Sequence, residues 1–375
     1  MTAYDFATGN TNPETFPTDG FAEAAAGAIK AMAADINRYH GKYGHEGLRQ
    51  LMADREFARE GVRIDPENIV LTNGSMQSIT LVTEALCQGQ GDVVVMEEYC
   101  YMGTINYFKS LGIEMAGVAM DAHGMRMDSL AETLQRLADE GCKPRFIYTL
   151  PTYQNPTGTM LPRERRLELV DLARRHDVVV VEDNCYGDVH FDGDKPPALY
   201  SLDDSPRQIY ICSLSKIFAP GVRLGYVTAA PEMIERILAQ RHDAGPNTLA
   251  AAITHAYLKD RLWDHIETAN VGLKAKRDAM LGALETHLGN LCSISPPVGG
   301  LFIWVRLPDD LDPGHLLEVA NRHDVNFAHG STFHIHSDAG PYIRLAFGFP
   351  SVAEIETGIE RLGIAVREAR GSQPA

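Results

Sequence analysis

Short, almost entirely apolar runs alternate with segments of helical periodicity through the middle of the chain, from about residue 67 to residue 228. The runs are centred near Val70, Val94, Met115, Ile147, Val179, Ile211 and Leu224. An uninterrupted apolar run of this kind is typical of a parallel strand that is buried on both faces. The alternation therefore predicts an α/β fold, with a mostly parallel sheet covered by helices on both sides.

The pattern changes towards the C-terminus. A long helical region is expected over about 247–288, and strands are expected over 299–306 and 342–347. Ser351 and Glu354 have the spacing of a capping box, which predicts the start of a final helix. A chain of 375 residues exceeds the usual size of a single core, so two domains are expected.

Lys216 follows the apolar strand expected over 208–212 and is flanked by Ser213 and Arg223. A lysine held away from water has a lowered pKa and can attack a carbonyl group as a free amine. Because Ser213 and Arg223 are phosphate-binding residue types, a carbonyl compound that carries a phosphate, such as pyridoxal 5′-phosphate (PLP), would suit this run. Alone, the run is also typical of a loop with a surface lysine.

Asn155 lies in a proline-containing turn over 151–158, directly after the strand expected over 145–150. An amide at the carboxyl end of such a strand points into the crevice where α/β sheets bind ligands. The alternative interpretation is an ordinary Asn-Pro turn.

Asp183 and Tyr186 follow the valine run over 178–181. A carboxylate at this strand end can pair with a protonated ring nitrogen, and a phenol can hydrogen-bond a ring oxygen. Alternatively, the aspartate caps a helix.

Ser75 and Met76 begin a helix expected over about 75–86, after a strand over 68–71. The turn before them offers free backbone N–H groups and the positive end of a helix dipole to a phosphate. By itself this signal is weak, because many strand-to-helix turns share it.

Together and in this order, the four motifs resemble the fold-type I PLP-dependent enzymes, specifically the class I/II aminotransferases. The branch with 2-aminoadipate and aromatic amino-acid aminotransferases is the most similar, and the resemblance runs from 4–10 to 341–345. It implies a large PLP-binding domain over 45–275 and a smaller α+β domain formed by 1–44 and 276–375. It also implies a homodimer whose sites lie at the subunit interface.

The resemblance also implies roles for individual residues. Lys216 would form an aldimine with PLP and move a proton as general base and acid. Asp183 would keep the pyridine nitrogen protonated, so that the ring acts as an electron sink. Asn155 and Tyr186 would hydrogen-bond the ring's phenolate oxygen.

The remaining roles concern the phosphate, the ring face and the substrate. The phosphate would be held by Ser75, the Met76 backbone, Ser213 and Arg223. Tyr101 would stack on the ring. Arg344 would bind the substrate α-carboxylate as a bidentate pair, with Asn155 and Gly9 also at the substrate site. Tyr39 would reach the neighbouring subunit's phosphate site, with Tyr43 as a competitor for that role.

Two segments depart from the family pattern. The run over 99–103 lacks two prolines that usually surround the stacking tyrosine, which leaves Tyr99 as a rival of Tyr101. His329 replaces a usual proline near the substrate side, which suggests a role in specificity. His334 and His336 alternate as one face of a strand would, but without a nearby third ligand we expect no metal.

Composition narrows the choice of partners. The net charge of −16, from 34 basic and 50 acidic residues, argues against nucleic acid and anionic membranes as partners. No apolar stretch approaches the roughly 20 residues that a membrane helix needs, and no secretory signal is visible. The six cysteines show no paired spacing, which favours reduced thiols and a cytoplasmic protein.

These observations favour an enzyme that moves the amino group of an α-amino acid to a 2-oxo acid. With no confident second arginine for a side-chain carboxylate, a neutral, apolar or aromatic substrate is favoured, and Phe16, Tyr101 or Phe333 could form an aromatic wall. The alternative is a PLP-dependent lyase, a β/γ-replacement enzyme or a decarboxylating enzyme that uses the same site. A PLP-binding regulatory domain without turnover is a third reading, which the acidic charge and the absence of a preceding DNA-binding segment disfavour.

Overall fold

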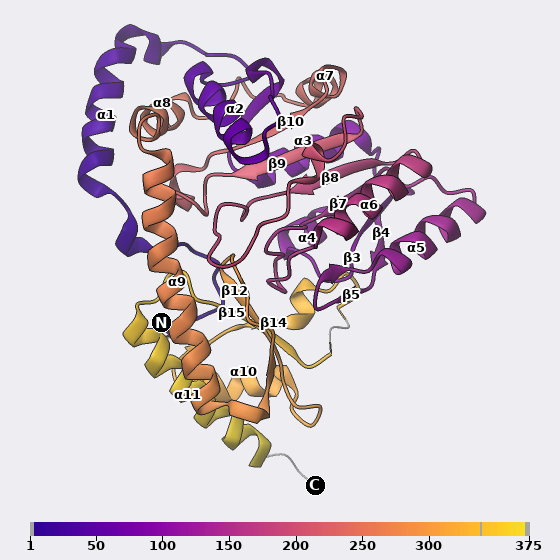
Figure 1. The fold of residues 1–375 in the computed structure, drawn as a ribbon, viewed down its shortest axis with the longest axis vertical. Helices are drawn as coiled ribbons and strands as arrows, with labels where there is room; N and C mark the ends of the chain where they lie inside the picture. The colour runs from indigo at the N-terminus through magenta and orange to yellow at the C-terminus, as the bar shows by residue number, and fades with distance from the viewer. Residues whose placement is uncertain (1–3, 338–339, 372–375) are drawn as a thin grey trace.

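The computed structural model describes residues 4–337 and 340–371 and is built around a seven-stranded sheet (Figure 1). The strand order is β2-β10-β9-β8-β7-β3-β4. In chain order the strands are β2 (Ile69–Thr72), β3 (Val93–Glu97), β4 (Glu114–Val118), β7 (Phe146–Thr149), β8 (Val179–Asp183), β9 (Gln208–Ser213) and β10 (Gly225–Ala229). All neighbours pair in parallel except β10, which is antiparallel to both β2 and β9. The predicted mostly parallel sheet is confirmed.

Apolar side chains on both faces of this sheet are covered by helices. Val95, Ile147 and Val180 pack in one cluster with residues of α5 (Met127–Asp139) and α6 (Arg163–Arg175). The alternate positions along the same strands belong to the main core. On that second side lie α2 (Glu46–Glu60), α3 (Ser75–Leu86), α4 (Met102–Ser110) and α7 (Pro231–Ala239). Burial on both faces explains why the strands read as unbroken apolar runs.

A second sheet has four antiparallel strands in the order β11-β12-β15-β14. They are β11 (Ser293–Ile294), β12 (Phe302–Arg306), β15 (Tyr342–Ala346) and β14 (Ala328–His329), accompanied by α10 (Pro313–Arg322) and α11 (Val352–Gly371). The predicted capping box is present, because the Ser351 backbone N–H donates to the Glu354 carboxylate at 2.8 Å.

The N-terminal segment touches both parts of the molecule. β1 (Tyr4–Asp5) pairs in parallel with β13 (Val325–Asn326), next to the four-stranded sheet. In contrast, α1 (Thr18–Met32) packs along α8 (Thr248–Leu258), beside the seven-stranded sheet. The expected helical region over 247–288 is two helices, since Lys259–Arg261 interrupt it before α9 (Leu262–His287). In Figure 1, α9 runs from α8 down to α11 and spans the distance between the two sheets.

Short elements complete the chain. A small hairpin pairs β5 (Met120–Asp121) with β6 (Gly124–Met125). Single 3-10 turns lie at Pro13–Thr15, Ala33–Asn37, Pro66–Asn68, Leu199–Ser201, Pro220–Val222, Gly289–Leu291 and Gly330–Phe333. Within the described ranges, no helix combines the length and the apolarity needed to cross a bilayer.

Candidate active site

A cavity of about 420 Å³ opens where the carboxyl ends of the parallel strands meet the four-stranded sheet. Loops after β7, β8 and β9 contribute to it, as do the N-terminus of α3, strands β12 and β15, and the segment that follows β1. The predicted site residues that line it are Gly9, Ser75, Met76, Tyr101, Asn155, Asp183, Tyr186, Ser213, Lys216, Arg223 and Arg344. Residues far apart in the sequence therefore converge on one site, in the place where α/β sheets bind ligands.

Lys216 projects its amine into this cavity directly beyond β9. Its Nζ donates a hydrogen bond to the Gly9 carbonyl oxygen at 2.7 Å and lies 5.9 Å from the centre of the Tyr186 ring. Burial lowers the pKa of Lys216 to about 8, and the positive charges of Arg344 and Arg223 act in the same direction. About a tenth of the Lys216 amine is therefore in its free, nucleophilic form at pH 7, a far larger share than for an exposed lysine.

Asp183, at the end of β8, presents a buried carboxylate to the same cavity. Tyr148 donates to its Oδ2 at 2.7 Å, and the Cys185 thiol donates to its Oδ1 at 2.8 Å. Burial raises the pKa of Asp183, while these two hydrogen bonds and the charge of Lys216 oppose that rise. This carboxylate can pair with a cationic ring nitrogen.

Arg344, on β15, is buried against two aromatic rings. Its guanidinium carbon lies 4.1 Å from the ring centre of Phe302 and 4.4 Å from that of Phe333. Burial lowers its pKa to about 10, so the side chain remains charged at neutral pH. Its Nη2 donates to the Ala7 carbonyl at 2.6 Å, but its buried Nε–H has no hydrogen-bond partner in the described part of the chain. A guanidinium with an unused donor is suited to a carboxylate ligand.

Ser75, Ser213 and Arg223 line the cavity and are residue types that suit an anion. Ser75 opens α3, whose first backbone N–H groups have no partners within the helix. The preceding residue, Gly74, has φ 87°, and a Cβ built there would lie 2.5 Å from Nη2 of Arg223. The glycine therefore lets the guanidinium approach the helix N-terminus closely. Ser215 adds a further hydroxyl to the lining.

The structure distinguishes between the two tyrosines of the altered turn. Tyr101 caps the N-terminus of α4, lines the cavity and is 36% exposed. Tyr99 instead packs edge-on against Trp304 and Tyr342, at ring-centre distances of 5.6 and 5.9 Å, and does not line the cavity. Tyr101 is thus the tyrosine placed to cover a bound ring.

Other singled-out residues lie away from the cavity. Tyr39 is 91% exposed, whereas the ring of Tyr43 packs 5.5 Å from the Arg49 guanidinium. His329 accepts a hydrogen bond from the Ser331 backbone N–H at 3.0 Å, and Phe16 packs against other aromatic rings. Neither His329 nor Phe16 lines the cavity, which departs from the expected substrate-side roles. The capping role of His329 explains its position.

Two histidines of the C-terminal part, His334 and His336, lie close together. His334 and His336 stand 6.1 Å apart between ring centres, next to the turn Gly330–Phe333 and not on a strand. Across residues 4–337 and 340–371, no group of three or more histidine, cysteine, aspartate or glutamate side chains is arranged to hold a metal ion.

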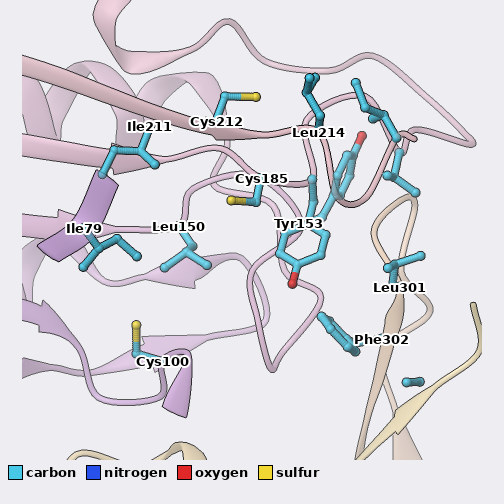
Figure 2. Close-up of a cluster of buried hydrophobic side chains, with 14 of the residues drawn as sticks. Ile79, Cys100, Leu150, Tyr153, Cys185, Ile211, Cys212, Leu214, Leu301 and Phe302 are labelled. Atoms are coloured by element: carbon cyan, nitrogen blue, oxygen red, sulfur yellow. The ribbon is translucent and has the colours of Figure 1, made fainter. Parts of the chain in front are cut away.

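Apolar residues that were not predicted as site residues form part of the cavity wall. Leu150, Cys185 and Phe302, which are labelled in Figure 2, all line the cavity. The Phe302 ring packs edge-on against Tyr186 at 5.6 Å, which connects the small-sheet wall to the phenol. Phe302 was expected only as part of a strand, because no signal in one sequence shows which face of that strand lies over a site.

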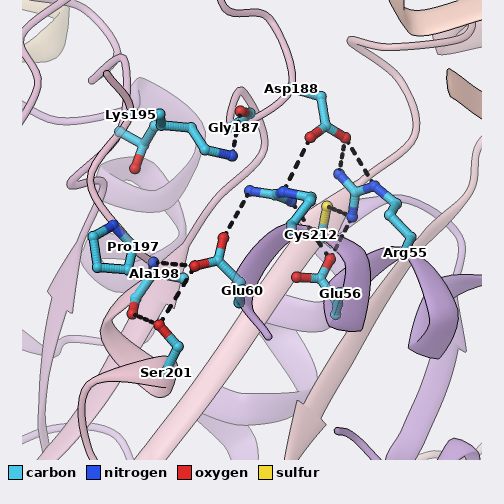
Figure 3. A network of polar contacts seen from close by, with 12 residues as sticks. Arg55, Glu56, Glu60, Gly187, Asp188, Lys195, Pro197, Ala198, Ser201 and Cys212 are labelled. Atoms are coloured by element: carbon cyan, nitrogen blue, oxygen red, sulfur yellow. Dashed lines mark hydrogen bonds and ion pairs between the residues drawn. The ribbon is translucent and has the colours of Figure 1, made fainter. Parts of the chain in front are cut away.

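A buried network of charges holds the loop that carries Tyr186 (Figure 3). Arg55 donates from Nε to Asp188 Oδ2 at 2.8 Å, and Arg59 Nε lies 3.1 Å from Asp188 Oδ1. Both arginine side chains and Asp188 are almost fully buried. The arginines hold the pKa of Asp188 at about 2 against the opposing effect of burial. Because Asp188 is two residues from Tyr186 in the same loop, this network helps to fix the position of the Tyr186 side chain.

The cavity residues fit PLP. A reactive amine, a carboxylate for the ring nitrogen, a phenol and an amide for the ring oxygen, and residue types that suit an anion are all present in one cavity. The additional arginine with an unused Nε–H leaves a separate place for a substrate carboxylate.

Comparison with known proteins agrees with this chemistry. The family model described as aminotransferase class I and II matches residues 4–362. The chain is 34% identical to an aromatic-amino-acid aminotransferase of Thermococcus litoralis, over 95% of this chain and 86% of that protein. It is 30% identical to a 2-aminoadipate transaminase of Thermus thermophilus, over 96% and 89%. A crystal structure of a multiple substrate aminotransferase from Thermococcus profundus superposes with a TM-score of 0.94 at 31% identity, covering 99% and 93%.

The chain therefore belongs to the class I and II aminotransferases. The predicted fold-type I architecture, the PLP cofactor and the aminotransferase reaction class are confirmed. The comparisons give no support to the lyase, replacement or decarboxylating alternative over aminotransfer.

Proposed function

We propose that this aminotransferase accepts α-amino acids with neutral, apolar or aromatic side chains and passes their amino group to a 2-oxo acid. The observation that carries this proposal is the charge of the cavity. Among the described residues that line it, the cations are Lys216, Arg223 and Arg344. Their positions suit a reactive amine, a phosphate and an α-carboxylate, so the described lining residues of this chain leave no further cation for a second substrate carboxylate.

The residues divide the work of the reaction. PLP supplies an aldehyde carbon for the amino group and a ring that withdraws electrons. Arg344 binds the substrate carboxylate and so orients the Cα–H bond towards Lys216. The Lys216 amine, with its pKa of about 8, takes that proton and returns it as the general acid. Asp183 stabilises positive charge at the ring nitrogen.

Asn155 and Tyr186 act on the ring oxygen together. Nδ2 of Asn155 donates to the Tyr186 hydroxyl at 3.2 Å, which leaves the Tyr186 proton available for the cofactor oxygen. Gly9 contributes its carbonyl, which accepts a hydrogen bond from the free Lys216 amine at 2.7 Å. Ser75, the Met76 backbone, Ser213 and Arg223 bind the phosphate, and Tyr101 stacks on the ring.

The test is to add single amino acids to the PLP-loaded protein without any oxo acid. We expect one equivalent of oxo acid per site, with the cofactor recovered as pyridoxamine phosphate, and the largest rates for aromatic and large apolar amino acids. If glutamate or 2-aminoadipate reacted fast while neutral amino acids did not react, the proposed substrate class would be contradicted. Catalytic release of ammonia or carbon dioxide would contradict aminotransfer.

We also propose that the active form is a homodimer. Support comes from Tyr39, which is 91% exposed and belongs to the same N-terminal stretch as the exposed apolar residues Ile29 and Ile36. We propose that Tyr39 reaches the partner's phosphate site, because Tyr43 is occupied within its own chain by Arg49. Mixing inactive Tyr39→Ala and Lys216→Ala chains should restore activity in hybrid dimers, each of which contains one intact site. No recovery from a verified hybrid would remove Tyr39 from this role.

A cytoplasmic location is proposed as well. Its support is that all six cysteines are free thiols in the structure, as is usual in a reducing compartment. Cell fractionation followed by thiol labelling would test it, and recovery of the protein from an oxidising compartment would contradict it.

A further inference from the structure

Asp183 is held by two side chains that have no role in the function proposed above. Tyr148, on β7, donates to Oδ2 at 2.7 Å, and Cys185, in the loop after β8, donates to Oδ1 at 2.8 Å. Tyr148 is 0% exposed, Asp183 is 3% exposed and Cys185 is 7% exposed. Two buried donors from separate parts of the chain therefore hydrogen-bond the two oxygens of one carboxylate.

The direction of the Tyr148 hydrogen bond is fixed by a third residue. Thr104, on α4, donates its hydroxyl to the Tyr148 oxygen at 3.2 Å. Since this oxygen already accepts a hydrogen bond, its own proton is free to point at Asp183. The Tyr148 ring packs edge-on against Phe108, at 6.1 Å and 84°, so its surroundings on that side are apolar.

The two donors matter because the site itself disfavours an ionised carboxylate. Burial raises the pKa of Asp183, and the hydrogen bonds from Cys185 and Tyr148 are among the effects that lower it. A carboxylate stripped of its donors in an apolar site tends to keep a proton of its own. A neutral carboxyl group cannot hold positive charge on a nearby ring nitrogen.

We propose that Tyr148 and Cys185 are positioning residues that keep Asp183 ionised and aimed at the cofactor's ring nitrogen. This inference rests on the proposed function, since it assumes that Asp183 faces that nitrogen. It predicts that protonation of the ring nitrogen depends on two residues that need not touch the substrate.

The test uses PLP labelled with ¹⁵N in the ring, bound to wild type, Tyr148→Phe, Cys185→Ala, Cys185→Ser and the Tyr148→Phe/Cys185→Ala double variant. The ¹⁵N chemical shift reports the protonation state of the nitrogen directly. We expect a protonated nitrogen in wild type and in Cys185→Ser, which keeps a donor. We expect a partial loss of ring-nitrogen protonation in Tyr148→Phe and in Cys185→Ala, and a larger loss in the double variant. The Kd of the apoprotein for PLP should rise about tenfold for each lost donor.

Tyr153→Phe is the matched control. Tyr153 is also 0% exposed, and its hydroxyl bonds His190 at 2.5 Å instead of Asp183. Its removal should leave the ¹⁵N shift unchanged, with melting temperatures recorded for all variants.

An unchanged shift in Tyr148→Phe and Cys185→Ala would overturn the inference. It would equally fall if Cys185→Ser lost as much protonation as Cys185→Ala, or if Tyr153→Phe did so too, because packing would then be the cause. If the double variant does not fold, the single variants decide the matter. Failure of the wild type to bind PLP would instead overturn the proposed function.

Discussion

Nη1 of Arg344 donates to Oδ1 of Asn155 at 2.7 Å, and Nδ2 of the same amide donates to the Tyr186 hydroxyl at 3.2 Å. One buried amide thus joins the arginine that would bind the substrate to the phenol that would bind the cofactor. A carboxylate bound at the Nε–H of Arg344, which has no partner among the described residues, would share the guanidinium with Asn155. With these roles, the side chain of Asn155 would couple substrate binding to the hydrogen bonding of the ring oxygen.

Replacing Arg344 should separate substrate binding from cofactor binding. Arg344→Gln should lower kcat/KM for amino acids by about 100-fold, mainly through KM, because a charged hydrogen-bonded pair is lost. The Kd for PLP should change by less than about threefold. Arg306→Gln is the control, since this arginine is on the neighbouring strand β12 but pairs with exposed Asp309 at 2.6 Å. An unchanged KM in Arg344→Gln would remove Arg344 from the carboxylate role.

The pH dependence of PLP capture should follow the pKa of Lys216. The free amine is the reactive form, so the rate at which apoprotein binds PLP covalently should rise with pH and level off above a pKa of about 8. Stopped-flow absorbance measures this rate. Lys195 also has a pKa lowered to about 8 by burial, but it bonds the Gly187 carbonyl outside the cavity. Lys195→Gln should keep the profile and Lys216→Ala should abolish the reaction, whereas a midpoint near 10.5 would contradict the burial argument.

Gly74→Ala should weaken phosphate binding. The new Cβ would lie 2.5 Å from Arg223 Nη2, which forces the guanidinium away from the α3 N-terminus. We expect the Kd for PLP to rise about tenfold, measured by titration of apoprotein. Gly91→Ala is a matched control, because Gly91 has a similar φ of 93° but nothing within 4 Å of its Cβ position. Equal effects of the two substitutions would show that backbone strain is the cause.

Asp188→Asn should destabilise the protein although Asp188 does not line the cavity. It removes the charge of a buried carboxylate that pairs with both Arg55 and Arg59, which costs about 3–5 kcal/mol in the free energy of unfolding. The pKa of Asp188 is held at about 2, below that of an unfolded aspartate, so its contribution is complete above about pH 4. The stabilisation by Asp188 is lost as the pH falls from about 4 through about 2. Over this pH range, the free energy of unfolding should therefore fall more in wild type than in Asp188→Asn.

Asp177→Asn serves as the control for that measurement. Asp177 also pairs with two cations, Lys143 and Arg207, but its side chain is 65% exposed. We expect no measurable change in the urea midpoint, because solvent screens exposed pairs. A similar loss in both variants would show that the count of ion pairs, and not burial, decides stability.

The sequence was enough to predict the large sheet and most of the cavity. Each parallel strand is an apolar run such as 178–181, and the polar residues that follow the runs meet at one sheet edge by geometry alone. Lys216, Asp183 and Asn155 could therefore be placed together before any coordinates.

The remainder depends on packing that one sequence does not show. Tyr148 lies inside a strand, and only the sheet register brings its hydroxyl to Asp183. Phe302 and Trp304 lie on the same face of β12, yet only Phe302 reaches the cavity. His329 was expected at the substrate side but caps a turn, because its ring bonds the next turn's backbone at 3.0 Å.

The pairing of β1 with β13 has a consequence for biosynthesis. The segment that brings the Gly9 carbonyl to Lys216 is fixed by β13, by the Ala346 backbone N–H at 2.8 Å and by Arg344 at 2.6 Å. Translation makes Gly9 before the strands of the large sheet, and it makes these anchors after them. A nascent chain can thus fold its large sheet around Lys216 first, while the pocket around the amine closes only after β13 and β15 have been made.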